Sequence, residues 1–145
     1  MSVRLLWLTG IVLLLVAGCA GGSTDERTPE VPAVDVVSDF YYWYLGYPGN
    51  VLVEGGYHDS DALTGDFIAR LDDFVSQRMA YDPILCAQDL PGDYRVLPGE
   101  SADRVDVQTV WNAGTEFENI NTLQVWLVQI DGQWRIDAID CQPGD

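Results

Sequence analysis

The sequence predicts a single α+β domain, in which helices pack in a curved antiparallel sheet of three or four strands. The chain has 145 residues, of which 48% are hydrophobic and 21% charged, as in an ordinary globular domain. Two segments with helical periodicity come first, and runs of β-forming residues follow in the C-terminal part. Helices and strands that are segregated along the chain favour α+β over an alternating α/β arrangement.

The first helix is expected to begin near Val34 and to end before Pro48, and five aromatic residues, Phe40 to Tyr44, stand in a row within it. Its apolar residues form two adjacent stripes on a helical wheel: Val34, Val37, Tyr41, Tyr44 and Leu45 in one, and Val36, Phe40, Trp43 and Tyr47 in the other. A helix that is apolar over more than half of its circumference needs a curved sheet and a second helix around it. Pro48 and Gly49 end this helix.

Residues 51–61 contain two adjacent glycines and are expected to form a loop with at most one short strand. A second helix begins after Thr64, a suitable N-cap, with Leu63 and Ile68 placed as a hydrophobic staple. Its apolar stripe consists of Phe67, Ile68, Leu71, Phe74, Val75 and Met79. The helix is expected to continue to Asp82-Pro83, which places Arg78 inside the apolar stripe.

Three strands are predicted, over residues 104–111, 122–130 and 134–139. Asp131-Gly132 is typical of a two-residue hairpin turn, which sets Leu127 opposite Ile136. The same register sets Val125 opposite Ala138. The residues expected to face the helices are Leu123, Val125, Leu127, Trp134, Ile136 and Ala138.

The chain is strongly acidic, with 23 Asp and Glu against 7 basic residues, all of them Arg, and a net charge of -16. This charge argues against binding to nucleic acid or to anionic lipid, because both need basic groups. It attracts cations or basic partners. A solvated acidic surface and salt adaptation account for the same composition.

The N-terminus is expected to carry a secretory signal, because Arg4 precedes an apolar run, Leu5 to Ala17, that is too short to span a membrane. Val16-Ala17-Gly18-Cys19 resembles the bacterial lipobox. The resemblance implies that residues 1–18 are a signal peptide, that Cys19 is lipidated, and that the protein lies on the extracytoplasmic face of a membrane or envelope. Residues 19–33 then form a flexible tether with a reach of roughly 20 Å, and residues 34–145 form the domain.

The domain resembles a family of secreted bacterial domains of unknown function. The residues that carry this resemblance are Phe40 to Leu45, Leu63-Thr64, Asp82 to Asp89, Asp131 to Ile136, and Cys141. That family is similar to the nuclear-transport-factor-2-like superfold, a cone of curved antiparallel sheet around helices. The resemblance implies a pocket at the mouth of the cone. It implies no single activity, because superfold members include isomerases, dehydratases and pure binding modules.

Cys86 and Cys141 form an even pair in an oxidising compartment, so a disulfide between them is the expected state. It would close a loop of about 55 residues. The alternative is a catalytic thiol, for which His58, the one histidine of the chain, is the sole possible partner. His58 lies in a glycine-rich loop, and two Cys and one His at these spacings make a poor zinc site.

Six residues are candidates for a pocket: Asp39, Tyr41, Trp43, Tyr44, Arg78 and Asp89. Asp39 and Asp89 form a carboxylate pair if both point into the interior. Otherwise Asp39 lies on a solvated helix face and Asp89 belongs to a turn or a helix cap. Arg78 either binds an anion or a carboxylate, or lies with its stem over the core and its head at the helix C-terminus. The tyrosines and tryptophan either line a pocket or belong to the core. No catalytic residue, metal site or cofactor is assigned.

The expected function is that of a lipid-anchored binding or envelope-interaction module, with a protein or small-molecule ligand. One alternative is a pocket enzyme of the isomerase or dehydratase type, in which Asp39 or Asp89 and a tyrosine are the acid–base pair. Another is an inhibitor-like protein that docks its sheet on an envelope partner. We further expect Arg78 to have a carboxylate or carbonyl partner, and expect one buried cluster of Phe40, Trp43, Phe74 and Trp134.

Overall fold

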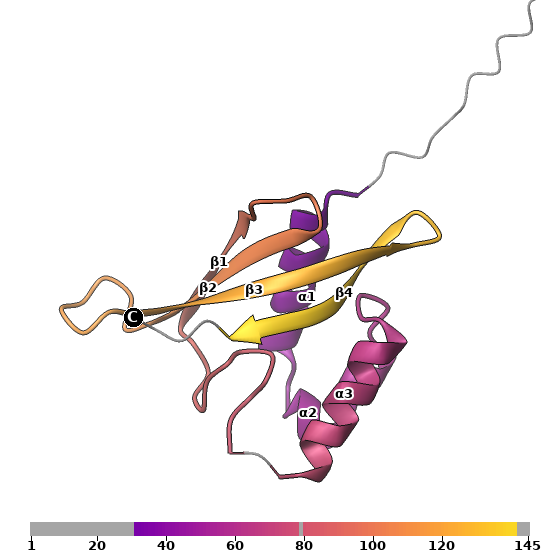
Figure 1. Ribbon diagram of the computed structural model, residues 1–145. Coiled ribbons are helices and arrows are strands. Elements are labelled where there is room, and N and C mark those ends of the chain that lie inside the picture. Colours follow the sequence, from indigo (N-terminus) through magenta and orange to yellow (C-terminus); the bar gives the residue numbers. More distant parts are fainter. Residues whose placement is uncertain (1–30, 79, 142–145) are drawn as a thin grey trace, which may run out of the picture.

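The computed structural model describes residues 31–78 and 80–141, and it confirms the predicted α+β class (Figure 1). The helical elements are α1 (Ala33–Gly46), α2 (Val51–Glu54), the 3-10 helix η1 (Gly56–Asp59) and α3 (Gly65–Ser76). The strands are β1 (Asp93–Pro98), β2 (Arg104–Trp111), β3 (Asn119–Ile130) and β4 (Gln133–Cys141). They form an open antiparallel sheet in the order β1-β2-β3-β4. The edge strand β1 was not assigned from the sequence.

The predicted signal peptide, residues 1–18, lies outside the described residues, as do Cys19 and the tether as far as residue 30. Within the described ranges, no helix is both long and apolar enough to cross a membrane.

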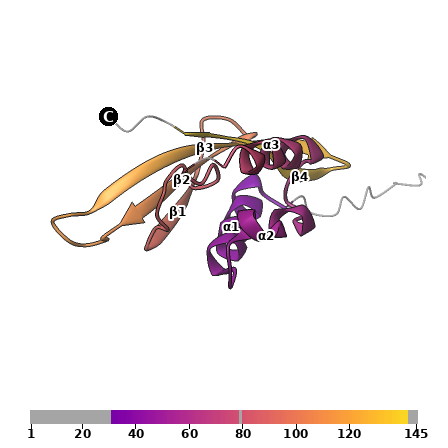
Figure 2. The ribbon, with the colours of Figure 1, turned by 90° about the horizontal axis from the view of Figure 1, so that it is seen from below.

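Helix α1 lies against one face of the sheet, with α2 on the same side (Figure 2). It buries Val37, Phe40, Tyr41 and Tyr44. The remaining apolar circumference of α1 is covered in part by the segment that follows α3. In this segment Ile84 and Leu85 are 0% and 1% exposed, and the Tyr41 hydroxyl donates to the Ile84 carbonyl at 2.8 Å. The sheet and the segment after α3 thus enclose α1 between them.

The prediction of a loop over residues 51–61 was wrong, because this segment forms α2 and η1. Asn50 caps α2: its side-chain oxygen accepts a hydrogen bond from the Val53 N–H at 3.0 Å. Gly55 ends α2 in the left-handed region, at φ 74°, where glycine carries no steric penalty. A helix of four residues is too short to show helical periodicity. Its two capping residues, Asn50 and Gly55, are therefore the local sequence features that indicate it.

The start of α3 is as predicted, since the Thr64 hydroxyl accepts from the Phe67 N–H at 3.0 Å. Its end is not, because α3 stops at Ser76 and Arg78 turns into the left-handed region at φ 52°. Arg78 therefore lies outside the apolar stripe. Its side chain is exposed and forms no hydrogen bond or ion pair with the described residues, so the expected partner of the guanidinium is wrong.

The predicted cluster of four aromatic residues is wrong in one member. Phe40 is buried, and Trp43 and Trp134 are half-buried against the same core. Phe74, in the last turn of α3, packs edge-to-face on Tyr81 at 5.0 Å and does not join the core. The early end of α3 explains this, because it brings the following chain back over Phe74.

The hairpin register is as predicted near the turn and shifts beyond it. Leu127 pairs with Ile136, but Val125 pairs with Ile139 and Ala138 with Trp126, because β4 carries a bulge at Asp137. Ala138 therefore moves to the outer face, and Ile139 takes its place against the core. One inserted residue reverses the alternation of every residue after it.

The bulge lies where the chain before α3 pairs with the outer edge of β4. The Ile136 N–H donates to the Ala62 carbonyl at 2.7 Å, and the Thr64 N–H donates to the Ile136 carbonyl at 3.0 Å. Leu63 and Ile136 thus form a parallel bridge. The Thr64 hydroxyl also donates to the Asp137 carboxylate at 2.7 Å. These contacts hold residues 60–62 next to the β3–β4 turn.

Cys86 and Cys141 form a disulfide, with their Cα atoms 5.5 Å apart. The bond joins the segment after α3 to the last residue of β4. The alternative of a catalytic thiol is therefore wrong, because neither sulfur is free to act as a nucleophile.

Candidate functional site

The six candidate pocket residues are distributed over two clefts and the core. Tyr44, Arg78 and Asp89 line a first cleft of about 490 Å³, between α1, α2, the end of α3 and residues 80–90. Asp39 and Trp43 line a second cleft of about 610 Å³. Tyr41 belongs to the core, where it is 0% exposed. The two candidate carboxylates, Asp39 and Asp89, are therefore not brought together.

The first cleft contains a carboxylate–tyrosine pair, but the carboxylate is Asp82. The Tyr44 hydroxyl donates to Asp82 Oδ2 at 2.7 Å. The other carboxylate oxygen, Oδ1, accepts from the backbone N–H groups of Ile84 at 2.8 Å and Leu85 at 3.1 Å. Asp82 therefore closes the turn over residues 82–85 and attaches it to α1.

Burial raises the pKa of Asp82 above its ordinary value, although the three hydrogen bonds to its carboxylate act in the opposite direction. The pKa of Tyr44 is also raised, chiefly by burial and then by the nearby Asp82 charge. A carboxylate whose two oxygens already accept three donors is poorly placed to take a proton from a substrate. The pair therefore acts as a structural clamp.

Sequence reasoning missed the role of Asp82, although a signal was present. In the sequence, Asp82-Pro83 predicts the end of a helix. An Asp side chain commonly accepts a hydrogen bond from the backbone N–H two residues later, and Asp-Pro favours turn initiation. The partner of this turn, Tyr44, could not be identified, because it lies far away in the sequence.

The second cleft lies between α1, residues 60–62 and the β3–β4 turn. Its residues are Val31, Val36, Asp39, Phe40, Trp43, Ser60, Asp61, Ala62, Asp131, Gly132, Gln133 and Trp134. Phe40 is 2% exposed, so it forms a buried part of the wall, and its ring lies 5.8 Å from that of Trp43. Trp134, at the start of β4, is half-buried. Three aromatic side chains from two distant elements thus line one concave surface.

Three carboxylates, Asp39, Asp61 and Asp131, line this cleft and come from three different segments. All three residues are exposed, and within the described part of the chain none of their carboxylate oxygens accepts a hydrogen bond. The guanidinium of Arg135 lies nearby, but it donates to the backbone carbonyl of Asp61 at 2.6 Å and does not line the cleft. The cleft is therefore aromatic on its walls and negatively charged overall.

Sequence reasoning placed Asp39 and Trp43 among the candidates but missed Asp61, Asp131 and Gln133. No sequence signal identifies these three, because Asp131 serves as a turn residue and Asp61 as a loop residue. They reach the cleft through the pairing of residues 62–64 with β4.

His58 contacts Asp72, with its Nε2 atom 2.9 Å from Oδ1, and it stacks on Tyr57 with the ring centroids 4.5 Å apart. The Tyr57 hydroxyl donates to the same carboxylate at 2.5 Å. Residues 57–58 are thereby attached to α3. Within the described ranges, no three His, Cys, Asp or Glu side chains come together as a metal-binding group.

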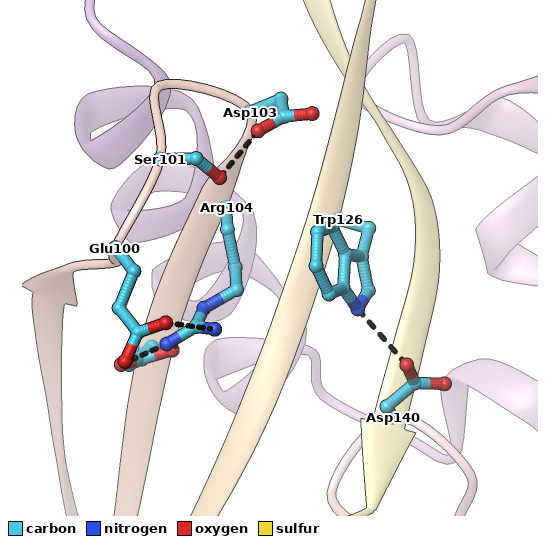
Figure 3. A network of polar contacts seen from close by, with 7 residues as sticks. Glu100, Ser101, Asp103, Arg104, Trp126 and Asp140 are labelled. Atoms are coloured by element: carbon cyan, nitrogen blue, oxygen red, sulfur yellow. Dashed lines mark hydrogen bonds and ion pairs between the residues drawn. The ribbon is translucent and has the colours of Figure 1, made fainter.

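The outer face of the sheet carries a polar network around Arg104 and Trp126 (Figure 3). The Arg104 guanidinium carbon lies 5.9 Å from the centroid of the Trp126 ring, and its Nε donates to Asp106 at 3.1 Å. A second carboxylate, that of Glu100, lies 3.4 Å from the guanidinium. The Trp126 indole N–H donates to Asp140 at 2.9 Å. The polar groups of this network are thus paired with one another by hydrogen bonds and ion pairs across β2, β3 and β4.

The fold is similar to that of a solved structure, a protein of unknown function from Bacteroides thetaiotaomicron VPI-5482. The two share 28% sequence identity with a TM-score of 0.61, over 77% of this chain and 90% of that one. No protein-family model matches the sequence, and no curated protein matches it. The likeness supports the α+β architecture, and it transfers no activity, because the function of that protein is unknown.

Proposed function

We propose that this protein is a lipid-anchored extracytoplasmic binding module whose ligand site is the second cleft. The observation that carries the proposal is a contrast between the two clefts. In the first, the half-buried carboxylate of Asp82 is fully engaged in holding the fold. In the second, aromatic walls and three carboxylates without hydrogen-bond donors among the described residues face a concave space. Such a surface suits binding, because a few polar groups in an apolar pocket orient a ligand.

The enzyme alternative has less support, because it requires an acid–base pair that is free to act. Asp39 and Asp89 lie in different clefts, and neither has a tyrosine hydroxyl bonded to it in the described structure. Asp82 and Tyr44, the described carboxylate–tyrosine pair whose two members both line the first cleft, are saturated by structural hydrogen bonds. The Tyr47 hydroxyl, which also lines this cleft, donates to Glu54 of α2 at 3.3 Å.

The lipid anchor is supported by the apolar segment that ends in Val16-Ala17-Gly18-Cys19. Two or three acyl chains at Cys19 would hold the protein stably on a membrane, whereas one would not. Val31, near the C-terminal end of the proposed tether, lines the second cleft. The proposed ligand site therefore lies at the end of the domain where the tether enters.

Docking of the sheet on an envelope protein is the other candidate. No described helix covers the outer face of the sheet, and Val128 and Ile130 of β3 are 39% and 41% exposed there. However, the centre of this face is occupied by the internally satisfied network of Arg104 and Trp126. A partner protein would find few polar groups at that centre that are free to form new hydrogen bonds or ion pairs with it.

Native mass spectrometry of the full chain, extracted from its own membranes, tests the proposal. We expect a bound ligand on the wild type that is lost from Trp43→Ala. The matched control is Tyr42→Ala, because Tyr42 is the next residue of α1 but is 76% exposed and lies outside the cleft. Asp39→Arg should also lose the ligand, and this change at an exposed position leaves the core intact. Equal retention of the ligand by Trp43→Ala, Asp39→Arg and the control would contradict the proposal.

A further inference from the structure

We propose that the ligand of the second cleft is an organic ammonium compound, in which a positively charged amine is carried on an apolar body. This inference rests on the proposed function, because it names the chemical class of the ligand for the same cleft.

The apolar body is inferred from the walls. The volume of about 610 Å³ lies within the range of roughly 300–1,000 Å³ that is typical of small-molecule sites. The half-buried Trp43 and Trp134 line this space, Val36 adds aliphatic surface, and the buried Phe40 lies in the wall behind them. Burying aromatic and aliphatic surface against a ligand removes it from water, which is favourable in proportion to the apolar area.

The positive charge is inferred from the carboxylates and from the rings. Asp39, Asp61 and Asp131 line the cleft from three different segments of the chain, and no basic side chain is among the lining residues. Indole and phenyl faces attract cations that come within about 6 Å of the ring centroid. The same carboxylates repel an anion. The net charge of the chain, -16, adds a long-range attraction for cations.

The described part of the molecule already contains such an arrangement, filled by one of its own side chains. On the outer face of the sheet, the Arg104 guanidinium lies over the Trp126 ring and is flanked by the carboxylates of Asp106 and Glu100 (Figure 3). The second cleft has the same components, namely indole rings and carboxylates. It lacks a described arginine directed into it, since Arg135 is bonded to a backbone carbonyl. A ligand cation would complete the set.

The test is a titration of the full chain in a non-ionic detergent, followed by the NMR signals of the Trp43 and Trp134 indole N–H groups. Three probes of similar size separate the contributions: phenethylammonium, the neutral 2-phenylethanol and the anionic 3-phenylpropanoate. We expect saturable shifts with phenethylammonium, about tenfold weaker binding of the alcohol, and no binding of the propanoate. Equal binding of the ammonium and the alcohol, or no saturable shift with the ammonium, would overturn the inference.

Carboxylate variants locate the charge. Asp39→Asn and Asp131→Asn should each weaken phenethylammonium binding about threefold, and together about tenfold. Asp131→Asn is compatible with the turn, because Asn-Gly is favoured there. The matched control is Asp73→Asn, which removes the same charge from the exposed surface of α3 and should bind like the wild type. A loss in Asp73→Asn equal to that in Asp39→Asn would mean that only the net charge matters, and would overturn the inference.

The two proposals fail separately. If the native ligand depends on Trp43 but phenethylammonium does not bind, the binding module stands and the ammonium class is wrong. If phenethylammonium binds as expected but the native ligand is retained by Trp43→Ala and Asp39→Arg, the chemistry of the cleft stands and its proposed role is wrong.

Discussion

Asp82 shows how one side chain can link two distant segments. Its carboxylate accepts two backbone N–H groups of the turn that follows it and the hydroxyl of Tyr44 on α1. Replacing Asp82 by Ala would leave these partly buried donors without their acceptor. Each unsatisfied donor costs about 1–3 kcal/mol, so Asp82→Ala should destabilise the domain more than a typical surface substitution does.

The raised pKa of Asp82 predicts how the stability of the domain depends on pH. Because its pKa in the fold is raised above 3.8, the folded state binds the proton more tightly than the unfolded state. The contribution of Asp82 to the free energy of unfolding should therefore fall as the pH rises from 3.8 through the raised pKa. Urea unfolding at several pH values should show that wild type loses stability relative to Asp82→Asn over this window.

Asp73→Asn controls for the removal of one carboxylate, because Asp73 lies on the exposed surface of α3. If the stability of wild type relative to Asp82→Asn increased with pH instead, the hydrogen bonds to the carboxylate would outweigh its burial, and the direction of the pKa shift would be wrong.

Among the elements, the junction between α3 and β4 has a testable centre in Thr64. Its hydroxyl accepts from the Phe67 N–H, which caps α3, and donates to the carboxylate of Asp137 at the bulge. Thr64→Ala should destabilise the domain by about 1–2 kcal/mol, as N-cap removals do. Thr64→Ser keeps the hydroxyl and should recover most of the loss in thermal or urea unfolding. Equal destabilisation by Ala and Ser would show that the methyl group, not the hydroxyl, is important.

The disulfide joins the segment after α3 to the end of β4, with a sequence separation of 55 residues. Reduction should lower the free energy of unfolding by about 4 kcal/mol, on the basis of the entropy of the released loop. Urea unfolding of the full chain with and without reductant measures this difference. The double variant Cys86→Ser, Cys141→Ser should unfold like the reduced wild type and should be insensitive to reductant. Unchanged unfolding on reduction would mean that the bond adds no stability.

At the scale of the whole molecule, the domain combines an acidic surface with a proposed lipid anchor. Removal of residues 1–18 takes away Arg4 and changes the net charge from -16 to -17. A chain with this charge is repelled by anionic lipid, so membrane association should depend on acylation.

Cys19→Ala should therefore abolish incorporation of a fatty-acid probe and release the protein, or its unprocessed precursor, from the lipid-modified fraction. Cys86→Ser, Cys141→Ser is the matched control, because it removes the other two cysteines and should still be labelled. Labelling of Cys19→Ala at the wild-type level would show that Cys19 is not the acylated residue.

The sequence by itself determined the features that depend on local order. These are α1, the start of α3, strands β2 to β4 and the hairpin at Asp131-Gly132, since helical period, strand alternation, caps and turn residues are properties of neighbouring residues. Only the tertiary structure decided where α3 ends, where β4 is bulged, and which carboxylates meet which rings. Arg78 leaves the helix as the chain turns back over Phe74, and Asp137 bulges where residues 62–64 pair with β4. The second cleft depends on the same pairing, because it places Asp61 beside Asp131 and Trp43 only once three distant segments have packed together. Such contacts join residues far apart in the chain, and local sequence patterns carry no information about them.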